Sequence, residues 1–280
     1  MKDDIFHLVK SLDKNEKGYF KKLTARYGAK TSGNDYLKLF DLLDKATEYD
    51  EAKIKKQFTK AGKKFNLSAQ KNYLYQQIIR ALRSYSSGKN STYSLQESLL
   101  DIQNLVDKNL INQAFELIDE CIRKAMESEN IEMELQLKLT EDKLMVRHNR
   151  QFSNEQILKV KEEIKVLTEQ INTELILSSL LIEMKKGDER RGTEEIVPED
   201  EKNFLEALLK NPVFEKTDSL RTKGKLLAYN VKHIGNMLLR KIPIAIEYLK
   251  QMQVLYKQIE MDANTTFNYL SSTSNLLVLS

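Results

Sequence analysis

The 280-residue chain has no tryptophan, one cysteine, three prolines and nine glycines. A single cysteine, Cys121, excludes an intramolecular disulfide and is typical of a protein from a reducing compartment. So few prolines and glycines leave long stretches without a residue that breaks helices. Hydrophobic residues make up 41% and charged residues 31% of the chain, as in a soluble globular protein. This composition favours an all-α protein.

Long hydrophobic runs are also missing. The most apolar stretch, LILSSLLI from Leu175 to Ile182, is far too short to span a bilayer. The first ten residues, MKDDIFHLVK, carry two acids and lack the apolar core of a signal peptide. We therefore expect a cytoplasmic protein that does not contact a membrane.

Apolar residues recur at helical spacing along almost the whole chain, and no stretch alternates convincingly at period two. The expected helices lie near 3–10, 14–28, 34–48, 51–62, 68–86, 94–107, 111–127, 130–149, 154–185, 199–210, 219–240, 243–259 and 263–278. Three pairs have the spacing of a capping box that starts a helix, namely Asp13 with Glu16, Ser94 with Glu97, and Ser153 with Gln156.

The 154–185 segment carries one continuous apolar stripe, which most often packs inside its own domain. Its members step by three and four residues: Ile157, Val160, Ile164, Leu167 and Ile171. The segment from Gly187 to Glu201 then contains two glycines, a proline and dense charge. We expect it to be an exposed loop.

Two segments of the chain are similar to each other. NLINQAFELIDECI begins at Asn109 and RKIPIAIEYLKQMQ begins at Arg240, and their alignment places Ala114 on Ala245 and Ile118 on Leu249. A short turn leading into a helix with a buried alanine resembles the second helix of a tetratricopeptide repeat, in which Asn109 and Arg240 stand where glycine is frequent. The front end, with SLDKNEKGYFKKL and KNYLYQQIIRALRSY, is similar to bacterial proteins that carry such arrays behind a helical head.

The resemblance implies a fold and a function. It implies a right-handed stack of antiparallel helical hairpins, a tetratricopeptide-like α-solenoid, over residues 91–280, with an N-terminal helical subdomain over 1–90. A stack of hairpins buries a continuous core and leaves a curved surface that binds proteins or peptides. We expect a non-catalytic scaffold for protein–protein interaction, with possible groove residues Lys223, Asn230 and Asn268 on the inner helices.

Charge is unevenly distributed. Residues 1–90 hold 20 basic and 10 acidic side chains, a balance of +10, whereas the rest of the chain has a balance of −6. No acid occurs from Ala52 to Gln96. When residues 51–62 and 68–86 are placed on helices, the exposed cations include Lys56, Lys60, Lys63, Lys64, Arg80 and Arg83.

This basic face has three readings. Clustered cations release counterions on binding phosphates, so residues 53–85 could contact nucleic acid, and the protein would then be a nucleic-acid-associated regulator. The same cations could bind an acidic protein, or they could be a plain solvated surface. Lysines outnumber arginines seven to two in 53–85, and lysine reads bases less well than arginine. The sequence leaves these alternatives open.

Patterns of catalysis and metal binding were sought without success. His7, His148 and His233 have no histidine or cysteine three or four residues away, so no local metal-ligand pair is present. GAKTSG, from Gly28 to Gly33, has the glycine spacing of a phosphate loop but lacks the lysine and hydroxyl that should follow. We expect no catalytic residue, no metal site and no cofactor.

The last eighteen residues, from Ala263 to Ser280, contain no charge. A terminal helix of a repeat array normally presents a polar outer face. The helix over 263–278 either packs inward, or contacts another chain as in a homo-oligomer, or is followed by further chain. The second and third explanations are the ones we favour, because an apolar end exposed to water is unfavourable.

Overall fold

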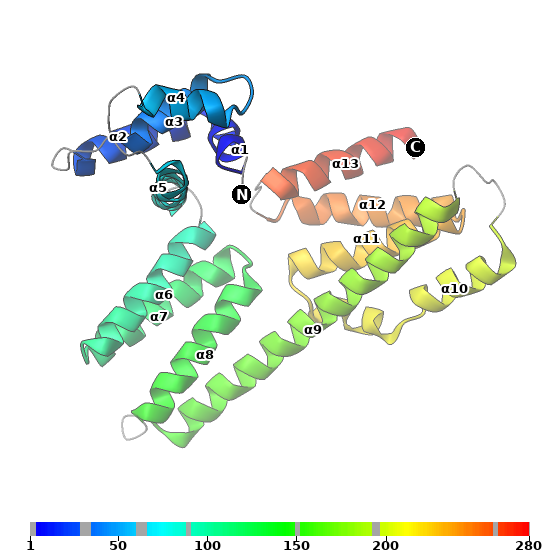
Figure 1. The fold of residues 1–280 in the computed structure, drawn as a ribbon. Coiled ribbons are helices and arrows are strands. Elements are labelled where there is room, and N and C mark those ends of the chain that lie inside the picture. Colours follow the sequence, from blue (N-terminus) through cyan, green and yellow to red (C-terminus); the bar gives the residue numbers. More distant parts are fainter. Residues whose placement is uncertain are drawn as a thin grey trace. The chain divides into compact units, whose positions relative to one another are not determined.

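The computed structural model describes residues 4–28, 35–59, 66–87, 91–148, 152–191, 197–259 and 263–279 (Figure 1). Over these ranges the regular structure is entirely helical, without a strand, which confirms the all-α prediction. Contacts between Cα atoms divide the chain into unit 1, Met1–Glu97, and unit 2, Ser98–Ser280. The division falls inside one helix, a few residues after the predicted boundary at residue 90. None of the described helices is long and apolar enough to cross a membrane.

Unit 1 is a bundle of five helices and the start of a sixth. They are α1 (Asp4–Ser11), α2 (Lys14–Gly28), α3 (Asp35–Lys45), α4 (Glu51–Thr59), α5 (Leu67–Ser87) and α6 (Ser91–Asp107), which continues into unit 2. The core forms because α1, α2 and α3 all pack on α5 or on one another. Its fully buried members include Val9, Leu39, Phe40, Leu43 and Leu74. The Phe20 and Phe40 rings lie 4.7 Å apart between centroids.

Unit 2 is built from consecutive helices that pack on one another. They are α7 (Ile111–Glu127), α8 (Ile131–Arg147), α9 (Asn154–Arg191), α10 (Glu199–Leu209), the 3₁₀ helix η2 (Pro212–Ser219), α11 (Thr222–Leu238), α12 (Ile242–Tyr256) and α13 (Ala263–Leu279). α7 packs on α8, α8 on the long α9, α9 on α11, α11 on α12 and α12 on α13. α10 and η2 pack against α11, and η2 also contacts α9.

Two of the three predicted capping boxes are present. The Asp13 carboxylate accepts the Glu16 N–H at 2.8 Å and Glu16 returns the bond to the Asp13 N–H. Ser153 and Gln156 exchange the same pair of bonds at the start of α9. The third prediction was wrong, because α6 begins at Ser91 and therefore already includes Ser94.

The apolar stripe of α9 faces the interior of unit 2, as predicted. Val160 and Leu167 are buried, and Ile157, Ile164 and Ile171 are half-buried. α9 ends later than expected, at Arg191 instead of near 185, so the predicted loop begins as helix. A glycine inside a helix costs only about 1 kcal/mol relative to alanine, which is too little to stop a long helix.

The two similar segments have the same turn geometry. Asn109 and Arg240 both adopt the left-handed backbone region, with φ of 59° and 58°. In both turns the backbone N–H of the following residue donates to the carbonyl five residues back, at 2.9 Å. This is the Schellman arrangement, in which glycine is favoured because it has no Cβ. The aligned Ala114 and Ala245 are both fully buried.

The uncharged C-terminal helix has two different faces. On the inner face the Tyr269 ring packs edge-on against Tyr256, and Ser272 is buried. On the outer face the apolar side chains of Leu270, Leu277 and Val278 are 60% to 81% exposed. α13 thus combines the inward packing that was one alternative with an apolar surface open to solvent.

Candidate functional site

The predicted basic face is described only in part. Lys60, Lys63 and Lys64 lie outside the described residues. Lys56 on α4, and Arg80 and Arg83 on α5, are exposed, and none of these three makes an ion pair with another described residue. Arg80 and Arg83 lie about one turn apart on α5 and share a face. The structure therefore leaves three of the six predicted cations free on the surface.

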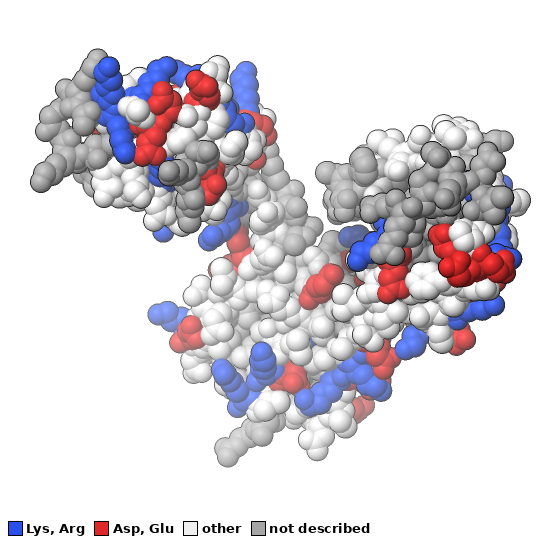
Figure 2. Space-filling view, turned by 45° about the vertical axis from the view of Figure 1, so that its right-hand side comes forward, with Lys and Arg blue, Asp and Glu red and all other residues white. Residues whose placement is uncertain are grey.

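Other cations of unit 1 are neutralised by carboxylates. The Lys17 ammonium lies 2.8 Å from Asp44, and that of Lys21 lies 2.7 Å from Asp41. Hydrogen bonds from Lys55 and Lys71 lower the pKa of Glu51 to about 2. Figure 2 shows the outcome, with acidic and basic side chains next to one another on the visible face of unit 1. The net charge of this unit overstates how basic its surface is.

A cavity of about 550 Å³ lies in unit 2 among α11, α12, α13 and the last turns of α9. Ligand sites commonly have volumes of this size. Its floor is apolar and its rim is polar. The described lining residues are Lys185, Lys223, Leu226, Leu227, Asn230, His233, Ile234, Leu249, Met252, Tyr256, Ile259, Asn268, Ser271, Ser272 and Asn275.

All three predicted groove residues line this cavity. Lys223 and Asn230 are separated by seven residues, so they lie on the same face of α11, and Asn268 projects from α13. Lys223 and Asn268 are exposed, and Asn230 is half-buried. Lys223 also donates from its ammonium to the Ser128 carbonyl, 3.1 Å away in the turn between α7 and α8. The cavity thus collects polar groups from two helices that are distant in sequence.

Two further polar residues of the cavity were not predicted, Lys185 and His233. His233 is only 5% exposed, and its Nδ1 lies 3.0 Å from the Ala245 carbonyl oxygen. Burial lowers the pKa of His233, and the bond to Ala245 opposes this effect without cancelling it. The signal available in the sequence was its place three residues after Asn230, on the same face of α11.

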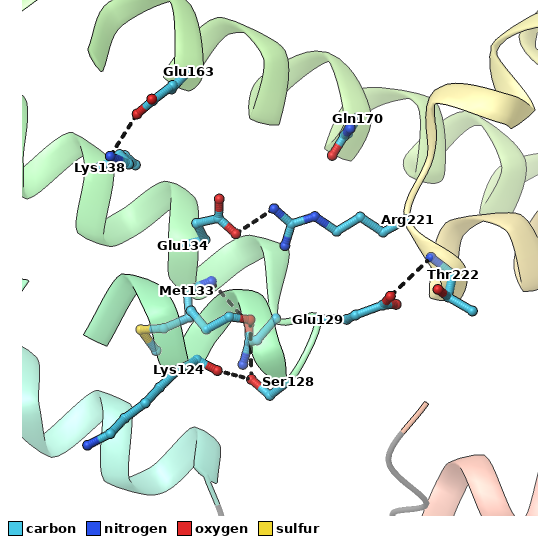
Figure 3. A network of polar contacts seen from close by, with 12 residues as sticks. Lys124, Ser128, Glu129, Met133, Glu134, Lys138, Glu163, Gln170, Arg221 and Thr222 are labelled. Atoms are coloured by element: carbon cyan, nitrogen blue, oxygen red, sulfur yellow. Dashed lines mark hydrogen bonds and ion pairs between the residues drawn. The ribbon is translucent and has the colours of Figure 1, made fainter. Parts of the chain in front are cut away.

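A polar network fixes α11 against α8 (Figure 3). The Glu129 carboxylate accepts the backbone N–H groups of Thr222 and Lys223, at 3.3 and 3.0 Å, and so caps the N-terminus of α11 from another helix pair. Next to it, Arg221 lies 2.5 Å from the buried Glu134 of α8. Because a carboxylate is favourable at a helix N-terminus, both contacts hold the start of α11 in place.

A second cavity, of about 560 Å³, lies beside this network. Its lining mixes basic side chains, Lys159 and Arg221, with acidic ones, Glu134, Glu162 and Glu163. Lys138 of α8 joins the acids by lying 2.7 Å from Glu163 and 2.9 Å from Glu141. A wall of both signs does not favour a ligand of either charge, so the first cavity is the better candidate site.

Metal chemistry was sought in the same way. Within the described ranges no group of three or more histidine, cysteine, aspartate and glutamate side chains is placed to hold a metal ion. Cys121 is buried in α7, as its spacing from Ala114 and Ile118 predicts.

Comparisons with protein-family models, with curated proteins and with solved structures find no match for this chain.

Proposed function

We propose that the protein is a non-catalytic scaffold for protein–protein interaction, built in unit 2 from a right-handed stack of tetratricopeptide-like helical hairpins. The paired turns at Asn109 and Arg240 support the repeat, because both have the same backbone conformation and the same hydrogen bonds. The buried alanines at Ala114 and Ala245 support it further, since a small residue lets neighbouring helices approach closely.

The observation that carries the binding function is the cavity in unit 2. Three polar residues that were singled out for a groove, Lys223, Asn230 and Asn268, line it together with an apolar floor. Asparagine amides provide both a donor and an acceptor, as a peptide group requires. A concave surface with an apolar floor and a few convergent polar groups is the usual form of a binding site. We take a protein or peptide segment as its occupant.

The proposal is tested with a fluorescein-labelled pool of hexapeptides that is random at every position. The full-length chain is expected to bind the pool saturably, as measured by fluorescence anisotropy. The triple variant Lys223→Glu, Asn230→Ala, Asn268→Ala is expected to lose at least tenfold in affinity, because each change removes hydrogen bonds worth about 0.5–1.5 kcal/mol. Asn203→Ala, an exposed change on α10, serves as the control. Equal binding by the triple variant, or no binding by the parent chain, would contradict the proposal.

A second candidate function is a nucleic-acid-associated regulator that uses the basic face of unit 1. Lys56, Arg80 and Arg83 favour it, because they are exposed cations without a carboxylate partner among the described residues. Such cations bind phosphates without reading sequence, and the affinity falls as salt rises.

This candidate predicts binding of mixed-sequence DNA or RNA at low salt. Changing Lys56, Lys60, Arg80 and Arg83 to glutamate is expected to weaken binding by about 10- to 100-fold and to flatten the dependence on salt. A variant with four charge reversals in unit 2, at Lys143, Lys159, Lys165 and Lys250, controls for net charge. Filter binding at several salt concentrations provides the measurement. If the parent chain binds neither nucleic acid, or if both variants bind equally, this function is excluded.

A further inference from the structure

His233 presents a hydrogen-bond acceptor at the cavity. Because a carbonyl oxygen can only accept, the bond to Ala245 places the ring hydrogen on Nδ1. In the neutral ring the other nitrogen, Nε2, then carries a lone pair. Nε2 makes no hydrogen bond with a described residue, although the side chain is 95% buried and lines the cavity. A ligand that donates a hydrogen bond at this point would satisfy it.

The charge of the cavity has one sign. Lys185 and Lys223 are among the described lining residues, and none of these residues is an aspartate or a glutamate. Lys185 is exposed at the end of α9 and makes no ion pair with a described residue. The ammonium of Lys223 has only the exposed bond to the Ser128 carbonyl, which is a neutral partner. Two cations without a carboxylate nearby attract an anionic group.

The floor between these polar groups is apolar. Leu226, Leu249 and Met252 are buried side chains that line the cavity, and they come from α11 and α12. The amides of Asn230, Asn268 and Asn275 surround them. An extended chain segment matches this arrangement, because it offers N–H donors, carbonyl acceptors and alternating side chains at a regular spacing.

We propose that the cavity binds an extended peptide segment that carries a carboxylate, and that His233 and Lys185 contact this ligand directly. His233 Nε2 accepts a backbone N–H of the segment, and Lys185 and Lys223 bind its carboxylate. This inference rests on the proposed scaffold function and specifies its partner. The carboxylate comes either from an acidic side chain or from the C-terminus of the segment, since both present the same group to the lysines.

The test uses three hexapeptide pools that are random in uncharged residues except at one fixed position, all acetylated. The first pool has a fixed glutamate and an amidated end, the second a fixed glutamine and a free C-terminus, and the third a fixed glutamine and an amidated end. Affinity of the full-length chain for the first or the second pool is expected to exceed that for the third by about tenfold, and which of the two is tighter identifies the source of the carboxylate. Equal affinity for all three pools would overturn the acidic preference.

The contact residues are tested with substitutions that keep the local structure. His233→Asn keeps a donor for the Ala245 carbonyl but removes the acceptor at the Nε2 position, and a loss of about five- to tenfold is expected. Lys185→Gln is expected to lose about two- to fivefold at low salt, whereas Lys186→Gln, an exposed neighbour outside the cavity lining, leaves the affinity unchanged. Parent-like affinity in His233→Asn would overturn its contact.

Nitrogen NMR of the imidazole rings tests His233 without a substitution. The spectrum of the parent chain is expected to show His233 protonated on Nδ1, with an Nε2 signal that moves when the tighter-binding acidic pool is added. His7 and His148, which do not line the cavity, serve as internal references. An Nε2 that carries the hydrogen, or a signal that stays fixed while the pool binds, would overturn the contact. Absence of binding by every pool, including the fully random one, would contradict the scaffold function and this inference together.

Discussion

Replacing Phe40 by alanine is expected to lower the free energy of unfolding of unit 1 by about 3–5 kcal/mol. Phe40 is fully buried in α3, and its ring packs on Phe20. Removing the ring loses the free energy of transferring it from water and leaves a cavity that the surrounding helices fill only in part. Urea denaturation followed by circular dichroism measures the loss, and hydrogen exchange of amides in α3 and α5 assigns it to unit 1.

The matched control is Phe204→Ala on α10, which removes the same ring. Phe204 is 50% exposed, so it loses less contact on truncation. Its cost is expected to stay below about 1.5 kcal/mol, half of what burying a phenylalanine fully can contribute. Equal costs for the two variants would mean that the core of unit 1 is not packed as described.

The second large effect concerns the ion pair between α8 and the start of α11. Replacing Arg221 by methionine is expected to cost about 2–3 kcal/mol in the free energy of unfolding of unit 2. The reason is that Glu134, which is only 5% exposed, would be left without its counter-charge. The figure is below that of a fully buried pair because the Arg221 side chain is 21% exposed. Urea denaturation of the full-length chain provides the measurement.

A double variant and a surface variant give this prediction its controls. Glu134→Met combined with Arg221→Met is expected to recover most of the loss, because no unpaired charge remains in the interior. Arg123→Met, an exposed change on α7, is expected to stay within about 0.5 kcal/mol of the parent. If Arg221→Met costs no more than Arg123→Met, the pair does not fix α11.

Local signals in the sequence predicted most helices, because each depends on neighbouring residues. The apolar spacing of α9 and the capping pair of Asp13 and Glu16 are examples. The same four-residue pattern at Ser94 and Glu97 failed, since it also occurs within a helix that has already begun. η2 was missed because the period of a 3₁₀ helix is about three residues and eight residues are too few to establish it.

The site was predictable only on α11 and α13. Lys223 and Asn230 were found because residues seven apart share a helix face, and Asn268 because α13 was expected to be an inner helix. Lys185 could not be found, because it reaches the cavity from the end of a helix that was expected to stop there. Only the carbonyl of Ala245, twelve residues away on another helix, distinguishes His233 from an ordinary helical position.

Lys223 belongs both to the cavity lining and to the contact with the turn between α7 and α8. Its backbone N–H is held by Glu129, whereas its ammonium reaches the Ser128 carbonyl through an exposed and therefore weak bond. An anion that recruits this ammonium must compete with Ser128 while the backbone stays anchored. Occupancy of the cavity and the conformational freedom of the α7–α8 turn are therefore thermodynamically coupled, and the coupling acts equally in both directions.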